Sequence, residues 1–483
     1  MKMNMKTWLI ALAASGLFVG CDDTGLDGEP TPDAMVGGEG EGEGEGEGEG
    51  EGEGEATGYA FTGRDGGDSV SYGGQTFRHV LIRAMKDHLG GLTERIDTQA
   101  IVPVEGDVLA ELQFYYTFDD TDGAEVEHGI STTPAPLQTT FGDISSGKDL
   151  RGKIAGNDAD GQHVDWNTVG LVGWGDAEVI TPDQLVVRWM ERVDALAVER
   201  AAGNPVLGPD GAPVASVFVD ADGVDYQQLL DKFLLGAIAF SQGADDYLDD
   251  DFEGKGLLAD HSALVDGKSY TALEHAWDEG FGYFGAARDY LDYTDDEIAD
   301  AGRRDTDGDG AIDLGREFNW GASVNAAKRD RGAAAAIDLT AQAFDGFYEG
   351  RALIASIEGE LSDSQLEQLR GHRDRALDAW EKAIAATAIH YVNDTLADMA
   401  AEVYDFAAHA KHWSELKGFA LSLQFNRLSP VSDEDFARIH SLLGNAPVLP
   451  GDDRFDGYAD DLIEVRTILG DAYGFSTENV EAW

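Results

Sequence analysis

The sequence predicts a mostly α-helical protein, built as one or more helical bundles with long irregular loops and at most a few short strands near the N-terminal part. Three observations predict this fold class. Apolar residues recur at helical spacing through most of the chain after residue 181. Strand signals are scarce. Helix-start residues stand where periodic segments begin, as in Thr181-Pro-Asp-Gln184, which combines an N-cap threonine, a proline in the first turn and a glutamine three residues after the cap.

The individual elements follow from the same periodicity. Predicted helices cover residues 75–89, 181–202, 225–248, 269–291, 319–356, 362–398, 400–425, 433–443 and 456–474. The longer ones are expected to break internally, for instance near Gly350 or Gly371. The segment Val108–Phe118 fits either a helix or a strand, and its aromatic residues favour a strand. Residues 134–175 are rich in Gly, Asp, Thr and Trp, which predicts a long irregular excursion packed by Trp166 and Trp174.

The composition excludes several classes of function. The chain has 483 residues, with 34 Lys+Arg against 93 Asp+Glu and a formal net charge of −59. Such an acidic surface repels nucleic acid and anionic headgroups, so neither nucleic acid nor a phospholipid surface is an expected partner. The 42% of hydrophobic residues are still enough for a sizeable core.

The N-terminal sequence predicts an export signal that ends at the single cysteine of the chain. Lys2 and Lys6 precede an apolar run from Trp8 to Val19, which is too short to span a bilayer. The five residues that end at Cys21, Leu-Phe-Val-Gly-Cys, resemble the lipobox of bacterial lipoproteins. That resemblance implies a signal peptide over residues 1–20, lipidation of Cys21 and anchoring through the lipid alone. The expected location is the bacterial cell envelope, at the outer membrane or cell surface in preference to the inner membrane. The alternative is an ordinary signal peptide with a stray cysteine.

Residues 21–56 are predicted to be a disordered acidic tether. Their last part, 39–55, alternates Gly and Glu and contains no apolar residue, so flexible backbone and like charges keep it extended. Binding of calcium or a partner by this repeat is the alternative to spacing. Residues 57–483 form the predicted helical domain, which could contain two related halves.

The segment 270–285 carries the first candidate site. On a helical wheel, Tyr270, Leu273, Phe281 and Phe284 gather around Trp277 as a core stripe. His275 and Glu279 fall on the far side above the small residues Gly282 and Ala286, with Asp278 on the flank and Glu274 beside them in sequence. Small residues there predict that a second element approaches closely. His275 and the carboxylates of Glu274, Asp278 and Glu279 are candidate ligands for a transition metal. The alternative is a solvated or structurally hydrogen-bonded histidine.

A second pair at helical spacing, His412 and Glu415, resembles the first. If the two helices faced each other, their imidazole and carboxylate groups could together bind iron, zinc or copper.

The residues 305–313, Asp-Thr-Asp-Gly-Asp-Gly-Ala-Ile-Asp, follow the pattern of a calcium loop. Acids stand at loop positions 1, 3, 5 and 9, glycine at 6 and isoleucine at 8. The predicted oxygen ligands are Asp305, Asp307, Asp309, the Ala311 carbonyl, Asp313 and Glu317. Position 12, which is glutamate in such loops, is Arg316, and Glu317 follows one residue late. The predicted role of calcium is structural, and the alternative is an acidic turn that binds nothing.

Six stretches of the chain resemble one protein family. They are Val70-Ser-Tyr-Gly-Gly-Gln-Thr76, Asp143-Ile-Ser-Ser-Gly-Lys148, Gly152-Lys-Ile-Ala-Gly-Asn157, Glu274-His-Ala-Trp-Asp-Glu-Gly-Phe-Gly-Tyr-Phe284, Asn325-Ala-Ala-Lys-Arg-Asp330 and Lys411-His-Trp-Ser-Glu-Leu-Lys-Gly-Phe-Ala420. In this order they resemble domain-of-unknown-function family 4856, whose members are envelope lipoproteins without an established activity. The resemblance covers nearly the whole chain from Tyr59 to Trp483. Where the family usually has a second histidine, this chain has Ala276.

A looser similarity links the chain to imelysin-like helical proteins, which are associated with iron uptake and carry a His-x-x-Glu motif. His412 and Glu415 match that motif, whereas His275 and Asp278 match it only with Asp in place of Glu.

Three functions are compatible with these patterns. The favoured one is a non-enzymatic, lipid-anchored binding protein with a His/carboxylate site for a metal or metal complex and a structural calcium loop. The second is a metal-dependent hydrolase or peptidase in which Glu279 or Glu415 acts as general base. The third is a structural or adhesive surface module. The sequence contains none of the standard nucleophile, zinc-protease or nucleotide-binding motifs, so no catalytic residue is assigned.

Overall fold

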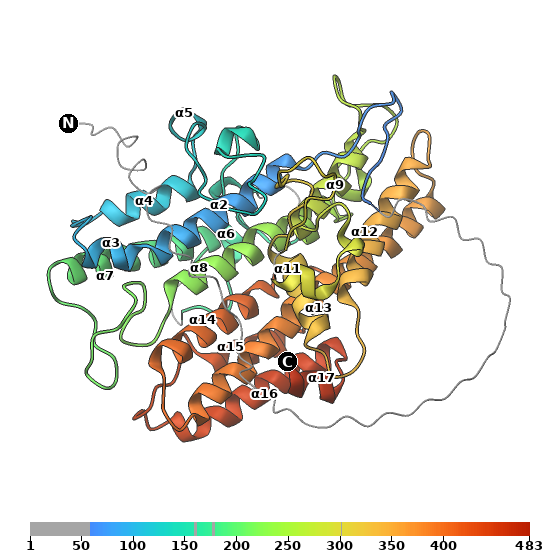
Figure 1. Ribbon diagram of the computed structural model, residues 1–483. Helices are drawn as coiled ribbons and strands as arrows, with labels where there is room; N and C mark the ends of the chain where they lie inside the picture. Colours follow the sequence, from blue (N-terminus) through green and yellow to red (C-terminus); the bar gives the residue numbers. More distant parts are fainter. Residues whose placement is uncertain (1–57, 159–161, 176–178, 301) are drawn as a thin grey trace, which may run out of the picture. The chain divides into compact units, whose positions relative to one another are not determined.

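The computed structural model describes residues 58–158, 162–175, 179–300 and 302–483, and it confirms the mostly α-helical fold (Figure 1). The predicted signal peptide, Cys21 and the acidic tether lie outside the described residues. Within those ranges, β-structure consists of isolated bridges such as Thr62↔Asp68 and Pro136↔Ile312. No helix in the described part of the chain is both long and apolar enough to cross a membrane.

The first half of the chain packs a group of helices drawn in blue to green in Figure 1. They are α2 (Gly73–Gly90), α3 (Leu92–Asp97), α4 (Asp107–Tyr116), α7 (Pro182–Ala201) and α8 (Tyr226–Leu234). Helix α7 begins with the predicted capping box, in which the Gln184 amide N–H donates to Thr181 Oγ1 at 3.1 Å.

The strand favoured for Val108–Phe118 is wrong, because this segment forms helix α4. Its buried residues, Val108, Leu112, Tyr115 and Tyr116, recur at helical spacing. The Asp194 carboxylate also accepts the free backbone N–H groups at its start, from Val108 at 2.9 Å and Leu109 at 3.1 Å. Tertiary contacts therefore override the β-propensity of its aromatic residues.

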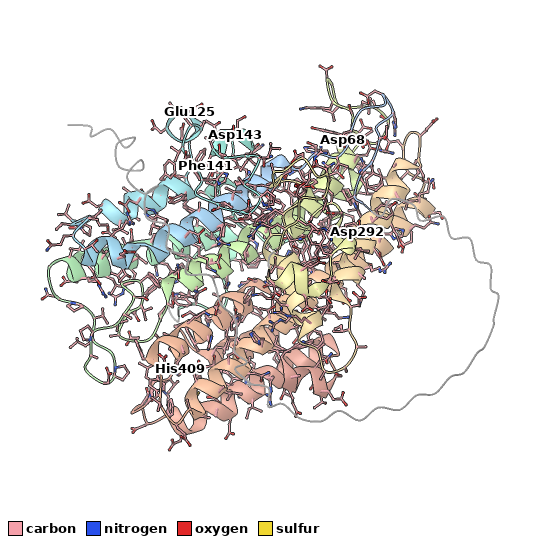
Figure 2. The ribbon with its side chains drawn as sticks, viewed as in Figure 1. Asp68, Glu125, Phe141, Asp143, Asp292 and His409 are labelled. Carbon is pink, nitrogen blue, oxygen red and sulfur yellow. The ribbon has the colours of Figure 1, made fainter. Side chains whose placement is uncertain are left out.

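The predicted irregular excursion is confirmed. Its regular parts are only short turns, namely η2 (Phe141–Asp143), η3 (Arg151–Lys153) and α6 (Trp166–Val169), and α5 (Asp120–Gly123) precedes it. Both tryptophans pack it as expected, Trp166 against Phe425 and Trp174 against Trp189. Phe141, labelled in Figure 2, joins the aromatic cluster of Phe77 and Phe118 beneath it.

Helix α8 continues into two π-helical segments, η4 (Leu235–Phe240) and η5 (Gly243–Tyr247). A Cβ at Gly236 would lie 1.9 Å from Ser422 Oγ, and one at Gly243 would lie 2.7 Å from the Trp380 ring. The glycines thus let neighbouring helices approach the widened turns. Such π-helical turns occur frequently at functional sites.

The second half of the chain is organised around the 38-residue helix α13 (Asp363–Ala400). The helices around it are α9 (Ala272–Phe284), α10 (Asp295–Asp300), α11 (Gly321–Arg331), α12 (Leu339–Ala355), α14 (Phe406–Ser422), α15 (Asp433–Leu443), α16 (Phe455–Tyr473) and α17 (Thr477–Ala482). Short turns η6 (Gly256–Leu258) and η7 (Tyr290–Asp292) complete this half. Helix α13 packs against α11, α12, α14 and α16, and α14 connects it to α8.

The breaks expected near Gly350 and Gly371 are wrong, because α12 and α13 run through both positions. The predicted helix over 319–356 is interrupted instead between α11 and α12, at residues 332–338. Gly350 has a packing role, since a Cβ there would lie 2.0 Å from the Trp277 ring.

Candidate functional site

Helix α9 starts at a capping box between Thr271 and Glu274. The Thr271 N–H donates to Glu274 Oε2 at 2.8 Å, and the Glu274 N–H donates to Thr271 Oγ1 at 3.2 Å. The predicted core stripe is confirmed, because Tyr270, Leu273, Trp277, Phe281 and Phe284 are all buried.

Two of the predicted metal ligands on α9 are instead neutralised by Arg351 of α12. This fully buried guanidinium donates to Glu274 at 3.0 Å and to Asp278 at 2.9 Å. Its third donor reaches Ser69 Oγ at 2.7 Å. Burial raises the pKa of Asp278 to about 6, although Arg351 opposes the shift.

The same carboxylates hold the N-terminal segment of the domain. Asp278 accepts hydrogen bonds from the Tyr59 hydroxyl at 2.9 Å and from the Ser71 N–H at 3.2 Å. With Ser69, three residues of this segment are thus tied to one buried ionic cluster. Glu274 and Asp278 therefore tie this segment to α9 and α12, and both acids already have hydrogen-bonding and cationic partners within the protein.

His275 and Glu279 form the polar edge of α9, and the element predicted to approach there is α2. A Cβ at Gly282 would lie 2.6 Å from Tyr72 Cβ and 3.0 Å from Gln75 Cβ. Glu279 accepts a hydrogen bond from Gln75 Nε2 at 2.8 Å. His275 places Nδ1 3.0 Å from the Ser71 carbonyl oxygen and Nε2 3.7 Å from Glu279 Oε2.

The second predicted pair, on α14, has its own partners. His412 Nδ1 lies 2.7 Å from Asp398 Oδ2, and this carboxylate raises the pKa of His412 against the effect of burial. Glu415 accepts from the Tyr391 hydroxyl at 3.0 Å and lies 3.4 Å from Lys232 Nζ.

The structure does not bring the α9 and α14 groups together around one ion. Within the described ranges, only two sets of three or more His, Cys, Asp or Glu residues place ligand atoms within 4.8 Å of one another, and neither includes these groups. The shared four-ligand site is therefore not formed, and transition-metal binding by these residues stays a prediction.

One of the two sets is the predicted calcium loop, where Asp305, Asp307 and Glu317 converge. Glu317 thus takes part although it comes one residue late in the sequence. Its two carboxylate oxygens also accept backbone N–H groups, Oε1 from Thr306 at 2.7 Å and Oε2 from Asp313 at 2.8 Å. These hydrogen bonds lower its pKa, although burial opposes them.

The other predicted loop ligands lie outside this three-residue set. Asp309 accepts from the Ala311 N–H at 2.8 Å, and Asp313 accepts from the Gly315 N–H at 2.8 Å and from Gln138 Nε2 at 3.0 Å. The loop also docks the excursion, since the Ile312 and Leu137 N–H groups donate to the Ala135 and Ile312 carbonyls.

The other set, Asp249, Asp250 and Asp251, already has cationic partners. Arg427 contacts all three carboxylates, and Arg370 and Arg373 also reach Asp250. The protein itself therefore neutralises this cluster.

Sequence reasoning missed a polar cluster on the other side of Glu279. It consists of Gln75 and Arg78 of α2, Lys153 and Asp158 of the excursion, Asp246 and Tyr247 of η5, and Glu279 and Tyr283 of α9. Three of the six family-like stretches supply residues to it, and this is the signal that could have found it. The contribution of η5 depends on π-helical geometry, which no sequence period predicted.

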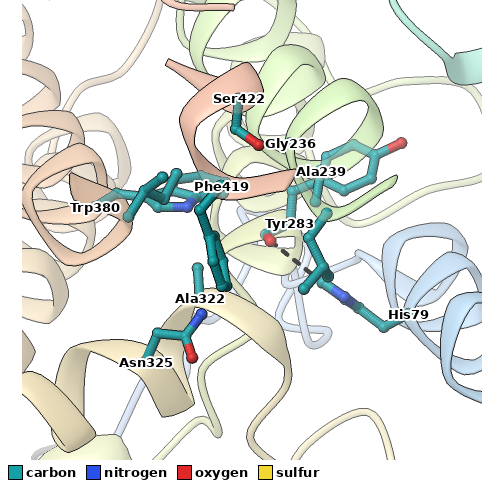
Figure 3. Close-up of a pocket in the computed structure, with 11 residues that line it drawn as sticks. His79, Gly236, Ala239, Tyr283, Ala322, Asn325, Trp380, Phe419 and Ser422 are labelled. Atoms are coloured by element: carbon teal, nitrogen blue, oxygen red, sulfur yellow. Dashed lines mark hydrogen bonds between the residues drawn. The ribbon is translucent and has the colours of Figure 1, made fainter. Parts of the chain in front are cut away.

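A small cavity lies next to this cluster, between η4, α9, α11, α13 and α14 (Figure 3). Leu235, Trp380 and Phe419 make its wall largely apolar, and His79 and Asn325 add polar groups. Burial lowers the pKa of His79 to about 4, against the effect of its hydrogen bonds to the Gly282 and Tyr283 carbonyls. His79 is therefore a neutral donor to these carbonyls at neutral pH.

The fold and the sites together define a helical protein with a buried Arg/carboxylate cluster and an acidic loop. Comparison with protein families gives one match, to the domain of unknown function DUF4856, over residues 187–443. Because this is more than half of the chain, the protein belongs to that family. No curated protein and no solved structure matches the chain. The similarity to imelysin-like proteins stays a prediction.

Proposed function

We propose that this chain is a calcium-binding helical protein of the bacterial cell envelope, held by a lipid on Cys21. The observation that carries the calcium assignment is the convergence of Asp305, Asp307 and Glu317 within 4.8 Å in a loop of calcium-binding pattern. Carboxylate oxygens are the ligands that Ca²⁺ prefers, and a divalent cation relieves the repulsion among three of them.

The proposed role of the ion is to hold together the segments that meet at the loop. The Arg288 N–H donates to the Arg316 carbonyl at 2.7 Å, and Arg316 Nη2 lies 3.2 Å from Asp68 Oδ2. Residues 135–137 join through Ile312. Calcium would thus couple the excursion and the N-terminal segment to the end of α9.

The test is calcium titration of the purified domain by calorimetry and thermal unfolding, with magnesium as competitor. We expect one calcium ion per chain and a calcium-dependent rise in Tm that is lost in the Asp305→Asn, Asp307→Asn double variant. Asp266→Asn, at an exposed acid outside the loop, serves as the matched control. Equal calcium binding by the double variant and the control would contradict the assignment.

The anchor is tested separately, because it rests on the N-terminal sequence. Cells that express the full chain should incorporate labelled fatty acid and retain the protein in the membrane fraction. Cys21→Ala should abolish the label and release the protein. Labelling that survives in Cys21→Ala would reject the lipobox assignment.

A smaller transition-metal site at His275 and Glu279 is the second candidate. His275 Nδ1 hydrogen-bonds a backbone carbonyl, which leaves Nε2 toward Glu279 in the orientation of a metal-binding imidazole. Zinc, copper and ferrous iron binding should weaken in His275→Ala but not in His372→Ala, at a partly exposed histidine that lies 3.3 Å from Glu349. Equal weakening or none in the two variants would dismiss the site.

A further inference from the structure

The cluster between α2, η5 and α9 holds several buried polar groups that the protein does not pair. The exposed fractions are 0% for Tyr283, 1% for Gln75, 5% for Arg78 and 8% for Asp246. The Tyr283 hydroxyl and Gln75 Oε1 have no hydrogen-bond partner in the described residues. Buried polar groups are nearly always paired, so such a concentration in one place needs a specific explanation.

Arg78 is the cation of this group. Its Nε donates to the Asp149 carbonyl at 2.9 Å and its Nη1 to the Gly74 carbonyl at 3.2 Å. Within the described ranges, no carboxylate forms an ion pair with its guanidinium. A buried charge without a counterion is unfavourable. The two groups that accept hydrogen bonds from Arg78 are backbone carbonyls, which carry no net charge.

Asp246 is the anion. Within the described residues, its carboxylate forms a long ion pair with the exposed Lys255, whose Nζ lies 3.9 Å from Oδ1. Burial raises the pKa of Asp246 to about 7, although Lys153 and Lys255 oppose the shift. This acid is therefore poorly solvated inside the fold.

Two tyrosines lie within electrostatic reach of both charges. The rings of Tyr247 and Tyr283 are 5.8 Å apart, and both Arg78 and Asp246 act electrostatically on both hydroxyls. The remaining charges nearby already have partners. Lys153 pairs with Asp158, and Glu279 accepts from Gln75. The stem of Lys148 reaches the start of α2 beside Gly74.

A metal ion does not fit this arrangement. Asp158, Asp246 and Glu279 are not among the sets whose oxygens come within 4.8 Å of one another. A ligand that satisfies both Arg78 and Asp246 must span several atoms and carry both signs of charge. A simple anion would pair only Arg78, and a simple amine would pair only Asp246.

We propose that this cluster binds a zwitterion of the α-amino-acid type. Its carboxylate would accept from the free guanidinium hydrogens of Arg78, and its ammonium group would donate to Asp246. The ring faces of Tyr247 and Tyr283 favour the ammonium group, and Lys153 Nζ already lies 5.5 Å above the Tyr247 ring. Gln75 Oε1 and the Tyr283 hydroxyl add the remaining hydrogen bonds. The π-helical turn of η5 brings Asp246 and Tyr247 to this place.

The experiment screens each common L-amino acid at millimolar concentration by thermal shift on the full chain, followed by calorimetry. We expect at least one to bind, and Asp246→Asn and Tyr283→Phe to weaken it roughly 10- to 100-fold by loss of a charge-assisted or buried hydrogen bond. Tyr404→Phe, at a tyrosine whose hydroxyl contacts His409 in α14, is the matched control.

Acetate and methylammonium separate the two halves of the ligand. Each should bind more weakly than the amino acid, and acetate binding should not weaken in Asp246→Asn, because that change removes a negative charge from the cluster. The proposal is overturned if no amino acid binds, if either half binds as tightly as the whole, or if binding in Asp246→Asn and Tyr283→Phe equals that in the control. If Asp246→Asn does not fold, the Tyr283→Phe result alone decides.

Discussion

The acids of α9 and the acids of the loop 305–317 have different charge partners. Glu274 and Asp278 are buried and share Arg351, so the protein supplies their counterion. Ligand atoms of Asp305, Asp307 and Glu317 lie within 4.8 Å of one another, but the contacts that hold these acids are mainly backbone N–H groups. The first set is therefore a structural ion cluster, whereas the second is the set for which we propose a cation from solution.

This difference shows that closely spaced carboxylates in a sequence do not by themselves indicate a cation-binding site. It must also be known whether the protein supplies their counterion. On α9 the partner lies 73 residues away in α12. In the loop, Arg316 is more than half exposed and contacts Asp68 and Asp313, outside the converging three. The expected responses to mutation, pH and calcium follow from this contrast.

Removing Arg351 should give the largest effect. Arg351→Met leaves Glu274 and Asp278 buried without a cation, and breaking a buried ion pair from one side costs about 3–5 kcal/mol. The free energy of unfolding, measured by urea denaturation, should fall by that amount. Arg438→Met is the control, since its pair with Glu464 is exposed and should contribute less than about 1 kcal/mol. Similar losses in both variants would refute the buried-cluster account.

The pH dependence of Asp278 should come next in size. Its pKa is raised to about 6, so the folded state favours the protonated acid. Its contribution to stability is then full below the ordinary pKa near 4 and is lost as pH rises through about 6, by on the order of 2–3 kcal/mol.

Asp278→Asn cannot titrate at this position. The stability of the wild type relative to Asp278→Asn should therefore decrease between pH 4 and pH 7, in parallel denaturation series. A constant difference over this range would show that the pKa of Asp278 is not raised.

The loop should respond to calcium instead of to a protein cation. Glu317→Gln removes one of the three converging charges, and we expect the calcium-dependent part of the unfolding free energy to fall by about 1–2 kcal/mol. Thermal unfolding is measured with calcium and with chelator. The difference gives the calcium-dependent stability, and the chelator series alone gives any loss of stability that does not depend on the ion. Glu358→Gln, at an exposed position, should keep the full calcium response.

The sequence could predict features that depend on nearby residues, and it missed those that depend on distant ones. The capping box at Thr181 and the stripe around Trp277 could be predicted because their partners lie within a few turns. Arg351 gave no such signal, and neither did the contact of Gly350 with Trp277, so the break expected there was wrong.

The candidate sites divide in the same way. The loop pattern located Asp305, Asp307 and Glu317 from the sequence, and the backbone fold brings Glu317 to the other two in spite of its shifted position. The partners of His275 and His412, Ser71 and Asp398, depend on how helices pack, which spacing does not specify. The cluster around Tyr283 joins three distant segments through a π-helical turn and was not predicted.

Replacing Arg316 should have the smallest effect on stability of the changes considered, and it distinguishes the two kinds of acidic cluster most clearly. Its guanidinium lies 3.2 Å from Asp68 and 3.6 Å from Asp313 on the exposed side of the loop. Arg316→Gln should lower stability without calcium by less than about 1 kcal/mol, because exposed pairs contribute little. The same change removes a positive charge beside the proposed calcium ligands, so calcium affinity should rise a few-fold at low salt, and the rise should shrink as salt increases. Arg331→Gln, in an exposed pair with Asp300, should leave calcium affinity unchanged. A fall in affinity in Arg316→Gln would mean that this arginine shapes the loop and does not compete with the ion.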